Sequence, residues 1–247
     1  MTVANYRVLI DNTAATESQL GLINSIRVDQ SIGMVTEAEV VINVALSDEG
    51  IWNEAATGFA RPFSRVRVEA GFGDNGHVPL IDGKVVGQRF ELSAAPGEST
   101  LTLIVHDDSA LLGQEETVRL FEGMSASEIA ETLLSEVGLT PETDNTPSAG
   151  SAQTRFVIQR GSPMQILREL AQQHGMFVYV KPGDQPGQSI GVFKKPQLNT
   201  EPVDELVLLG AARQFHKFTA QFDGMRPSRA AAGNVRISDK SLLNADV

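Results

Sequence analysis

The apolar residues of the first hundred positions recur at every second residue, and this alternation constrains the fold more than any other feature of the chain. Two runs show it: Val40, Ile42, Val44 and Leu46 alternate with Glu39, Val41, Asn43 and Ala45, and Val66, Val68 and Ala70 alternate with Arg65, Arg67 and Glu69. Period two predicts strands with one buried face. Further strands are expected at 7–10, 21–28, 84–92 and 100–106. Residues 1–108 are therefore predicted to form a β barrel-like domain or a sandwich.

After Asp107 the apolar spacing becomes helical. The segment 125–128 has the spacing of a capping box and leads into an apolar face that ends at Gly138, and Ser162, Pro163 and Gln165 open a second helix that ends at Gly175. Strands are expected at 155–161 and on both sides of the turn 181–188, with a loop at 140–153. Residues 109–200 are thus predicted to be an inserted α+β domain with two capped helices.

The last segment, residues 201–247, again has sequence patterns typical of strands, at 206–212, 213–223 and 233–238. A bulge or kink is expected near Lys217. Two or three strands do not form an independently stable sheet in water. We expect them to pair with the first β domain, with another chain, or with further residues of a longer protein. The overall prediction is an α+β fold: mainly β tube-like domains, the second possibly incomplete, interrupted by the α+β insertion.

Charge and composition exclude several classes of function. With 20 basic and 31 acidic residues the formal charge is −11, which opposes broad contact with phosphate backbones and disfavours nucleic-acid binding. The chain has no cysteine, so a disulfide scaffold, a cysteine zinc site and a cysteine nucleophile are excluded. No signal peptide, membrane anchor or apolar run of membrane-spanning length is expected.

Two motifs suggest binding chemistry, and each has a simpler interpretation. Residues 71–76 satisfy G-x-G-x-x-G after a strand, but they lead into the extended stretch 77–81 and not into a helix, so a hairpin turn is favoured over a nucleotide site. His106, Asp107 and Asp108 resemble metal ligands or a general base, yet His77, His174 and His216 lie in other elements. We interpret 106–108 as a strand end whose Asp108 or Ser109 caps residues 110–112.

Paired acids and a lone histidine give no stronger signal. Glu115 with Glu116, and Asp204 with Glu205, lie in polar loops as sequence neighbours, which favours solvated surface over the opposed carboxylates of a glycosidase. His174 at a helix end is expected to interact with the last carbonyls or the helix dipole. The sequence therefore predicts no enzyme and no catalytic, cofactor-binding or metal-binding residue.

Four stretches in order, at 66–92, 101–112, 118–139 and 155–180, resemble contractile-tail baseplate hub proteins, the late control protein D family of phages and the type VI secretion spike hubs. The resemblance implies a structural hub in a phage tail or injection particle, assembled in the bacterial cytoplasm. It also implies a ring-shaped homotrimer that links the tail tube protein to the spike protein. Two alternatives remain open: a cell-wall glycan-binding module formed by residues 118–195, and a peptidoglycan hydrolase.

Overall fold

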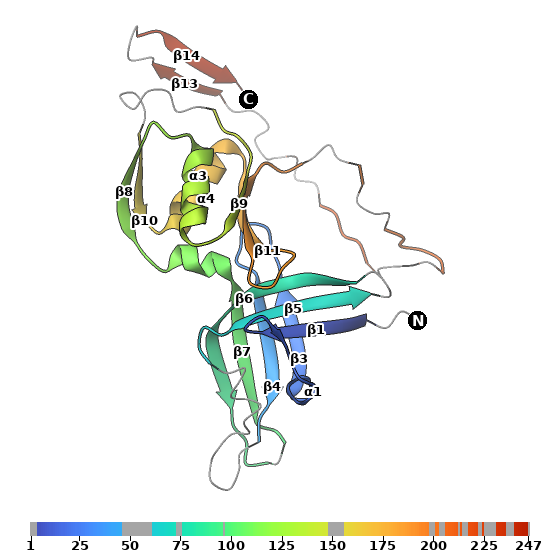
Figure 1. The fold of residues 1–247 in the computed structure, drawn as a ribbon. Coiled ribbons are helices and arrows are strands. Elements are labelled where there is room, and N and C mark those ends of the chain that lie inside the picture. Colours follow the sequence, from blue (N-terminus) through green and yellow to red (C-terminus); the bar gives the residue numbers. More distant parts are fainter. Residues whose placement is uncertain are drawn as a thin grey trace. The chain divides into compact units, whose positions relative to one another are not determined.

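The computed structural model divides the chain into two compact units, Met1–Gln197 and Leu198–Val247, each described by itself. In the first unit the structure describes residues 4–45, 61–72, 76–95, 97–147 and 156–197. In the second it describes 201–202, 206–211, 213, 217–221, 224, 231–235 and 240–246. The described chain is mainly β, as the alternation predicts (Figure 1).

A seven-stranded antiparallel sheet forms the first part of the first unit. Its strands are β1 (Ala4–Ile10), β2 (Thr13–Ala14), β3 (Ile23–Asp29), β4 (Glu37–Asn43), β5 (Arg65–Phe72), β6 (His77–Glu91) and β7 (Thr100–Asp107), with the short helix α1 (Glu17–Leu20) between β2 and β3. The spatial order is β2-β1-β5-β6-β7-β4-β3. The sheet curls without a ladder between β3 and β1, so it is an open half-barrel (Figure 1).

The alternation predicted the inward face of this sheet correctly. Val40 and Ile42 of β4 are fully buried, as are Leu101, Leu103 and Val105 of β7 opposite them. Aliphatic side chains that interdigitate across adjacent strands supply the hydrophobic core of this region. Strand β6 is longer than predicted because it begins at His77 and continues past a bulge opposite Glu69 and a second opposite Ile104.

Strand β5 differs from its prediction as a half-buried strand. Val66 and Val68 lie in the core, but Arg67 and Glu69 on the other face are also only 1% and 3% exposed. Both faces of β5 are therefore covered, and the charged face must be neutralised and hydrogen-bonded where it lies.

The predicted turn after β7 is a short 3₁₀ helix, η1 (Asp108–Gly113). Its cap is Asp107, whose side chain accepts a hydrogen bond from the Ser109 amide, so the prediction of Asp108 or Ser109 as the cap is wrong by one or two residues. The reason is that Asp108 is engaged elsewhere, in an ion pair with Arg65.

The second part of the first unit contains the two predicted helices. Its elements are β8 (Thr117–Glu122), α3 (Ala126–Glu136), β9 (Thr140–Thr143), β10 (Phe156–Gly161), α4 (Pro163–His174), β11 (Phe177–Pro182) and β12 (Ser189–Lys194). Strands β8 and β10 form one antiparallel pair, and β11, β12 and β9 form a second sheet in which β9 is parallel to β12. Ile129, Leu133, Leu167 and Phe193 are among the buried residues of their common core.

Both capping boxes are present as predicted. Ser125 with Glu128 opens α3, Ser162 with Gln165 opens α4, and Gly175 ends α4 with φ of 63°, which is the left-handed conformation that glycine adopts without strain. One expectation fails, because 140–143 is a strand where a loop was predicted. Strand β8 was not predicted. Residues 148–153 of that loop lie outside the described residues. The subdivision of the first unit at 108/109 stays a prediction.

In the second unit, β13 (Ala231–Val235) and β14 (Leu242–Asp246) form an antiparallel pair. The predicted strand 233–238 overlaps β13, whereas β14 was not predicted. The described residues 206–211, 213 and 217–221 contain no strand, so that part of the prediction is wrong. The bulge or kink expected near Lys217 is not tested, because the described residues around it, 217–221, form no strand and 214–216 lie outside the described residues.

Candidate functional site

The sequence motifs that suggested binding chemistry have structural roles. Strand β5 ends at Phe72 and β6 begins at His77, and the two pair as an antiparallel hairpin. The hairpin interpretation of 71–76 is confirmed for the flanking ladder, while residues 73–75 lie outside the described residues. No helix amino terminus follows the motif, which is the element a phosphate site needs.

The side chains of His106, Asp107 and Asp108 diverge. His106 Nε2 lies 2.8 Å from a carboxylate oxygen of Glu37, Asp107 accepts from the Thr36 amide at 2.6 Å, and Asp108 faces β5. Within the part of the chain that the structure describes, no group of three or more His, Cys, Asp or Glu residues is arranged to hold a metal ion.

The remaining candidates do not meet one another either. His77 contacts Asn5 at 2.5 Å and His174 lies in the last turn of α4, as predicted. Glu115 and Glu116 are exposed. The side chains of His216 and of the pair Asp204 and Glu205 are outside the described residues.

Among the described residues, six charged side chains form a cluster that was not predicted from the sequence. This ionic cluster consists of Arg7, Arg65, Arg67, Glu69, Asp82 and Asp108. Arg65 binds Asp82 at 2.7 Å and Asp108 at 2.8 Å, and Arg67 binds Glu69 at 2.7 Å and Asp82 at 3.0 Å. Arg7 adds a hydrogen bond to Glu69 at 2.7 Å. Three guanidinium groups therefore match three carboxylates.

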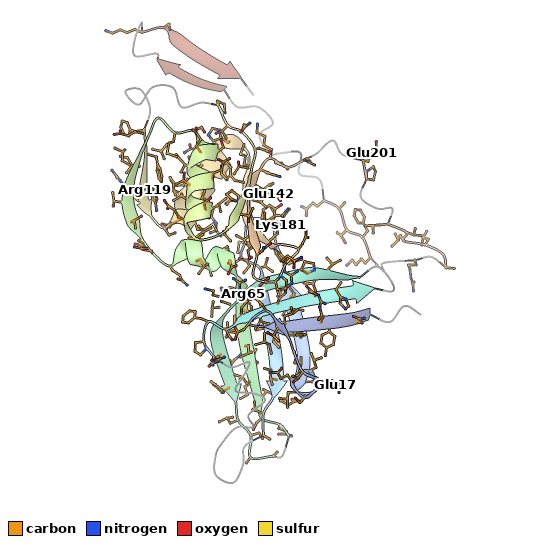
Figure 2. The ribbon with its side chains drawn as sticks, in the orientation of Figure 1. Glu17, Arg65, Arg119, Glu142, Lys181 and Glu201 are labelled. Atoms are coloured by element: carbon orange, nitrogen blue, oxygen red, sulfur yellow. The ribbon has the colours of Figure 1, made fainter. Side chains whose placement is uncertain are left out.

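The ionic cluster also joins the half-barrel to the turn between β11 and β12. Arg67 donates to the carbonyl oxygens of Gly183, Asp184 and Gln185 at 2.8, 3.2 and 3.3 Å. In return Asp82 accepts from the Gly187 amide at 2.8 Å, and Asp108 accepts from the Ser189 hydroxyl at 2.6 Å. Arg65 lies where the sheet meets β11 (Figure 2).

The pKa values in the cluster follow from these contacts. Burial raises the pKa of Glu69, but hydrogen bonds and the positive charges of Arg67 and Arg7 outweigh it and hold that pKa below its ordinary value. Burial likewise lowers the pKa of Arg65, and the contacts with Asp108 and Asp82 more than reverse this effect. Both shifts favour the charged forms of Glu69 and Arg65. The cluster consequently holds the turn in place through paired charges.

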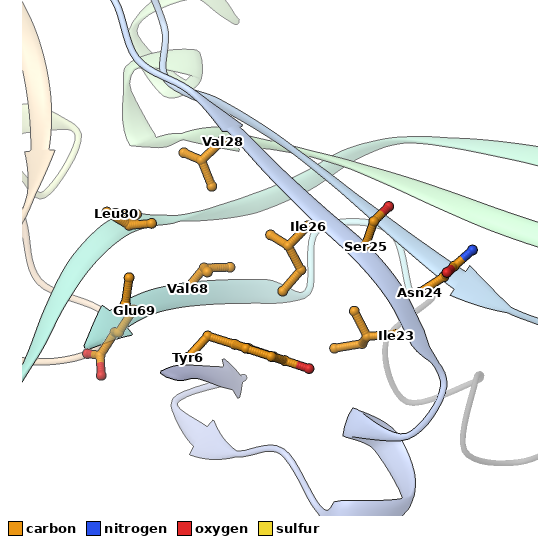
Figure 3. A pocket seen from close by; sticks show the side chains of 10 residues that line it. Tyr6, Ile23, Asn24, Ser25, Ile26, Val28, Val68, Glu69 and Leu80 are labelled. Carbon is orange, nitrogen blue, oxygen red and sulfur yellow. The ribbon is translucent and has the colours of Figure 1, made fainter. Parts of the chain in front are cut away.

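A groove lies in the half-barrel between the free edge of β3 and strands β1 and β5. This β3 groove has a volume of ≈ 510 Å³ and is lined mainly by apolar side chains: Tyr6, Ile23, Ile26, Val28, Val68 and Leu80 (Figure 3). Leu80 is the extra residue of a bulge in β6, and its carbonyl accepts a hydrogen bond from the Gln30 side chain at 2.6 Å. Among the described residues that line the groove, Glu69 is the only carboxylate, and it belongs to the ionic cluster.

In the described part of the chain, no helix is long and apolar enough to cross a membrane. The family model of the Alg8 N-terminal domain matches residues 1–234. The chain belongs to this family. A comparison of the chain with curated proteins found no match.

Solved structures with a similar fold are proteins of phage tails and of a secretion system. A tail protein from Neisseria meningitidis MC58 superposes with a TM-score of 0.59 at 14% identity, over 94% of this chain and 61% of that one. The 43 kDa tail protein of prophage MuSo2 from Shewanella oneidensis superposes with a TM-score of 0.58 at 17% identity, over 99% of this chain and 69% of that one.

A third similar structure is the E. coli c3393 protein, a type VI secretion component that itself resembles the T4 bacteriophage tail proteins gp27 and gp5. It gives a TM-score of 0.52 at 11% identity over 97% of this chain and 55% of that one. The chain thus has a fold similar to that of these tail proteins, and it spans 61% of the Neisseria protein.

Proposed function

We propose that the chain is a structural hub of a contractile tail or a related injection system. In this proposal three copies form a ring that connects the tail tube protein with the spike protein, in a particle assembled in the bacterial cytoplasm. The observation that carries the proposal is the tail-protein fold, which extends over 94% or more of the chain in three separate structures. Fold alone does not fix function, so the ring needs its own support.

The open half-barrel supports ring assembly. Its order leaves β3 at one edge and β2 with β1 at the other. Free strand edges present backbone donors and acceptors that pair readily with another chain, and closed symmetry covers such edges without indefinite growth. A ring in which the β3 edge of each copy faces the β1 edge of its neighbour would satisfy both edges at once.

A structural role also agrees with the charged groups. The carboxylates that lie close together, in the ionic cluster, are each bound by arginine. Acid–base catalysis needs a group that can take up or release a proton near neutral pH, and the arginine contacts that lower the pKa of Glu69 oppose this at that residue. We therefore propose a non-enzymatic scaffold.

Light scattering coupled to size exclusion tests the proposal. The expected result is a species of three times the chain mass of 26.5 kDa, which appears as a ring with three-fold symmetry in negative-stain images. Val28→Pro is expected to reduce the trimer, because the register directs the Val28 amide away from β4 to the free edge and proline cannot donate to a ladder there. A monomer at every concentration would contradict the ring, and peptidoglycan binding by such a monomer would favour the glycan-binding alternative.

A further inference from the structure

The β8–β10 pair has an outer face that is unusually apolar for a surface. In β8, Val118 and Leu120 are 81% and 51% exposed, and in β10, Phe156 and Ile158 are 61% and 39% exposed. The inner face of the same pair packs on the core through Phe121. The solvated face of an antiparallel sheet is normally polar, and contiguous exposed apolar side chains mark interaction surfaces.

The strand register gives this outer face an internal symmetry. Leu120 pairs with Ile158 at the centre, Val118 pairs with Arg160 at one end, and Glu122 pairs with Phe156 at the other. The face therefore has four apolar positions and two exposed charges, Glu122 and Arg160, at diagonally opposite corners. Glu122 and Arg160 are four residue steps apart along the strands and lie on neighbouring strands, which places their backbones ~14 Å apart. The two charges therefore do not pair within one copy.

We propose that the outer face of β8 and β10 is a contact between two copies of this chain related by a two-fold axis. A half turn about an axis in the contact plane, perpendicular to the Glu122–Arg160 diagonal, places Glu122 of each copy over Arg160 of the other. Leu120 and Ile158 then meet their counterparts at the centre. The face is complementary to itself, as a two-fold contact requires.

The strand geometry agrees with this contact. Two residue steps of ~3.3 Å and half a strand spacing of ~2.4 Å place the diagonal about 20° from the strands. The half turn consequently crosses the strands of the two copies at about 40°, which is near the roughly 30° found for face-to-face sheets. Two pairs of opposite charge then flank an apolar centre, the usual arrangement of a polar rim around a hydrophobic contact.

The size of the face sets the strength of the contact. Six residues of two strands cover on the order of 200 Å² in outline, well below the ~800 Å² per partner of stable complexes. The association is therefore weak and concentration-dependent. It is independent of the proposed ring: monomers give dimers, and trimers give closed hexamers when the three two-fold axes cross the three-fold axis at right angles.

Sedimentation velocity on the full chain, over roughly 5 to 500 μM, tests the contact. The wild type is expected to double in mass reversibly as its concentration rises. Leu120→Ser should abolish the doubling, whereas Leu92→Ser, which alters a leucine of similar exposure outside the face, should leave it unchanged. Circular dichroism of each variant verifies the fold.

A charge exchange identifies the second copy as the partner. Glu122→Arg and Arg160→Glu should each weaken the doubling about tenfold, because each puts like charges opposite one another. The double variant Glu122→Arg with Arg160→Glu should restore it, since both intermolecular pairs re-form with reversed polarity. A mass that does not double would overturn the proposal and assign the face to another partner. A double variant that associates no more strongly than either single variant would do the same. A trimer that never doubles would overturn this contact and leave the proposed ring intact.

Discussion

Replacing Arg67 by alanine tests whether the ionic cluster fixes the β11–β12 turn to the half-barrel. The substitution removes the guanidinium that binds Glu69 and Asp82 and that donates to three carbonyl oxygens of the turn. Glu69 and Asp82 are 3% and 1% exposed, so the two carboxylates stay buried with less compensation. The damage comes mainly from these charges, because Asp184 and Gln185 are exposed and water can replace the donor at their carbonyls.

The size of the effect follows from the remaining partners. Removal of one partner from a buried ion pair costs about 3–5 kcal/mol. Arg65 still binds Asp82 and Arg7 still binds Glu69, so the expected loss of unfolding free energy is near the low end, about 3 kcal/mol. For a unit of this size that corresponds to a fall in Tm of roughly 6–12 °C.

Thermal unfolding followed by circular dichroism measures the loss, and hydrogen exchange locates it. The amide of Gly187, which donates to Asp82, should exchange faster in Arg67→Ala. Arg67→Lys should keep the charge but lose most of the turn contacts, because an ammonium group lacks the planar fork of donors. Arg27→Ala is the matched control, since the pair of Arg27 with Asp29 is exposed and should contribute ~0.5 kcal/mol or less. An Arg67→Ala protein as stable as the control would refute this account of the cluster.

Three further changes probe single features of the chain. The folded pKa of Glu69 is depressed, so its stabilising contribution should be complete above its ordinary value of 4.5 and lost as pH falls through the folded pKa. Urea unfolding between about pH 3 and 6 should therefore show that the unfolding free energy depends less steeply on pH in Glu69→Gln than in the wild type. Gly83→Ala should prevent normal folding, since its Cβ would lie 2.6 Å from the backbone carbonyl carbon of His106, whereas Gly113→Ala meets open space and should fold like the wild type in expression and melting assays. Ser162→Ala should lower the unfolding free energy by about 1 kcal/mol, and no change in melting would contradict the role of its cap at α4.

The helices were predictable because the signals that define them are local. Ser125 and Ser162 cap helices through hydrogen bonds to residues three positions away, and the sequence displays both partners of each box. The inward face of β4 and β7 was equally accessible, since alternation is a property of the strand itself. By contrast β9 forms only through parallel pairing with β12, about fifty positions further along the chain, and its residues Thr140 to Thr143 carry no apolar alternation.

The ionic cluster was not predictable for a related reason. Arg67 meets Gly183 across 116 positions of sequence, and the alternation assigned the charged face of β5 to solvent. One signal was available: Arg65, Arg67 and Glu69 place both signs of charge on one strand face, with Asp82 on the paired strand. Opposite charges that neutralise one another are what a buried polar face requires. The same reasoning explains Asp108, whose partner Arg65 made it unavailable as a cap.

The two hydrophobic cores of the first unit are thus connected through directed polar contacts near Arg67. Apolar surfaces attract without preferred orientation, so a purely hydrophobic junction tolerates sliding. Planar guanidinium groups fix both distance and angle, and Arg67 uses this property on two carboxylates and three carbonyls at once. Because three arginines balance three acids, the net charge of −11 lies entirely on the rest of the chain. In the proposed ring, a rigid junction would let load on either part reach the other without rotation, which is a mechanical requirement for a link between tube and spike.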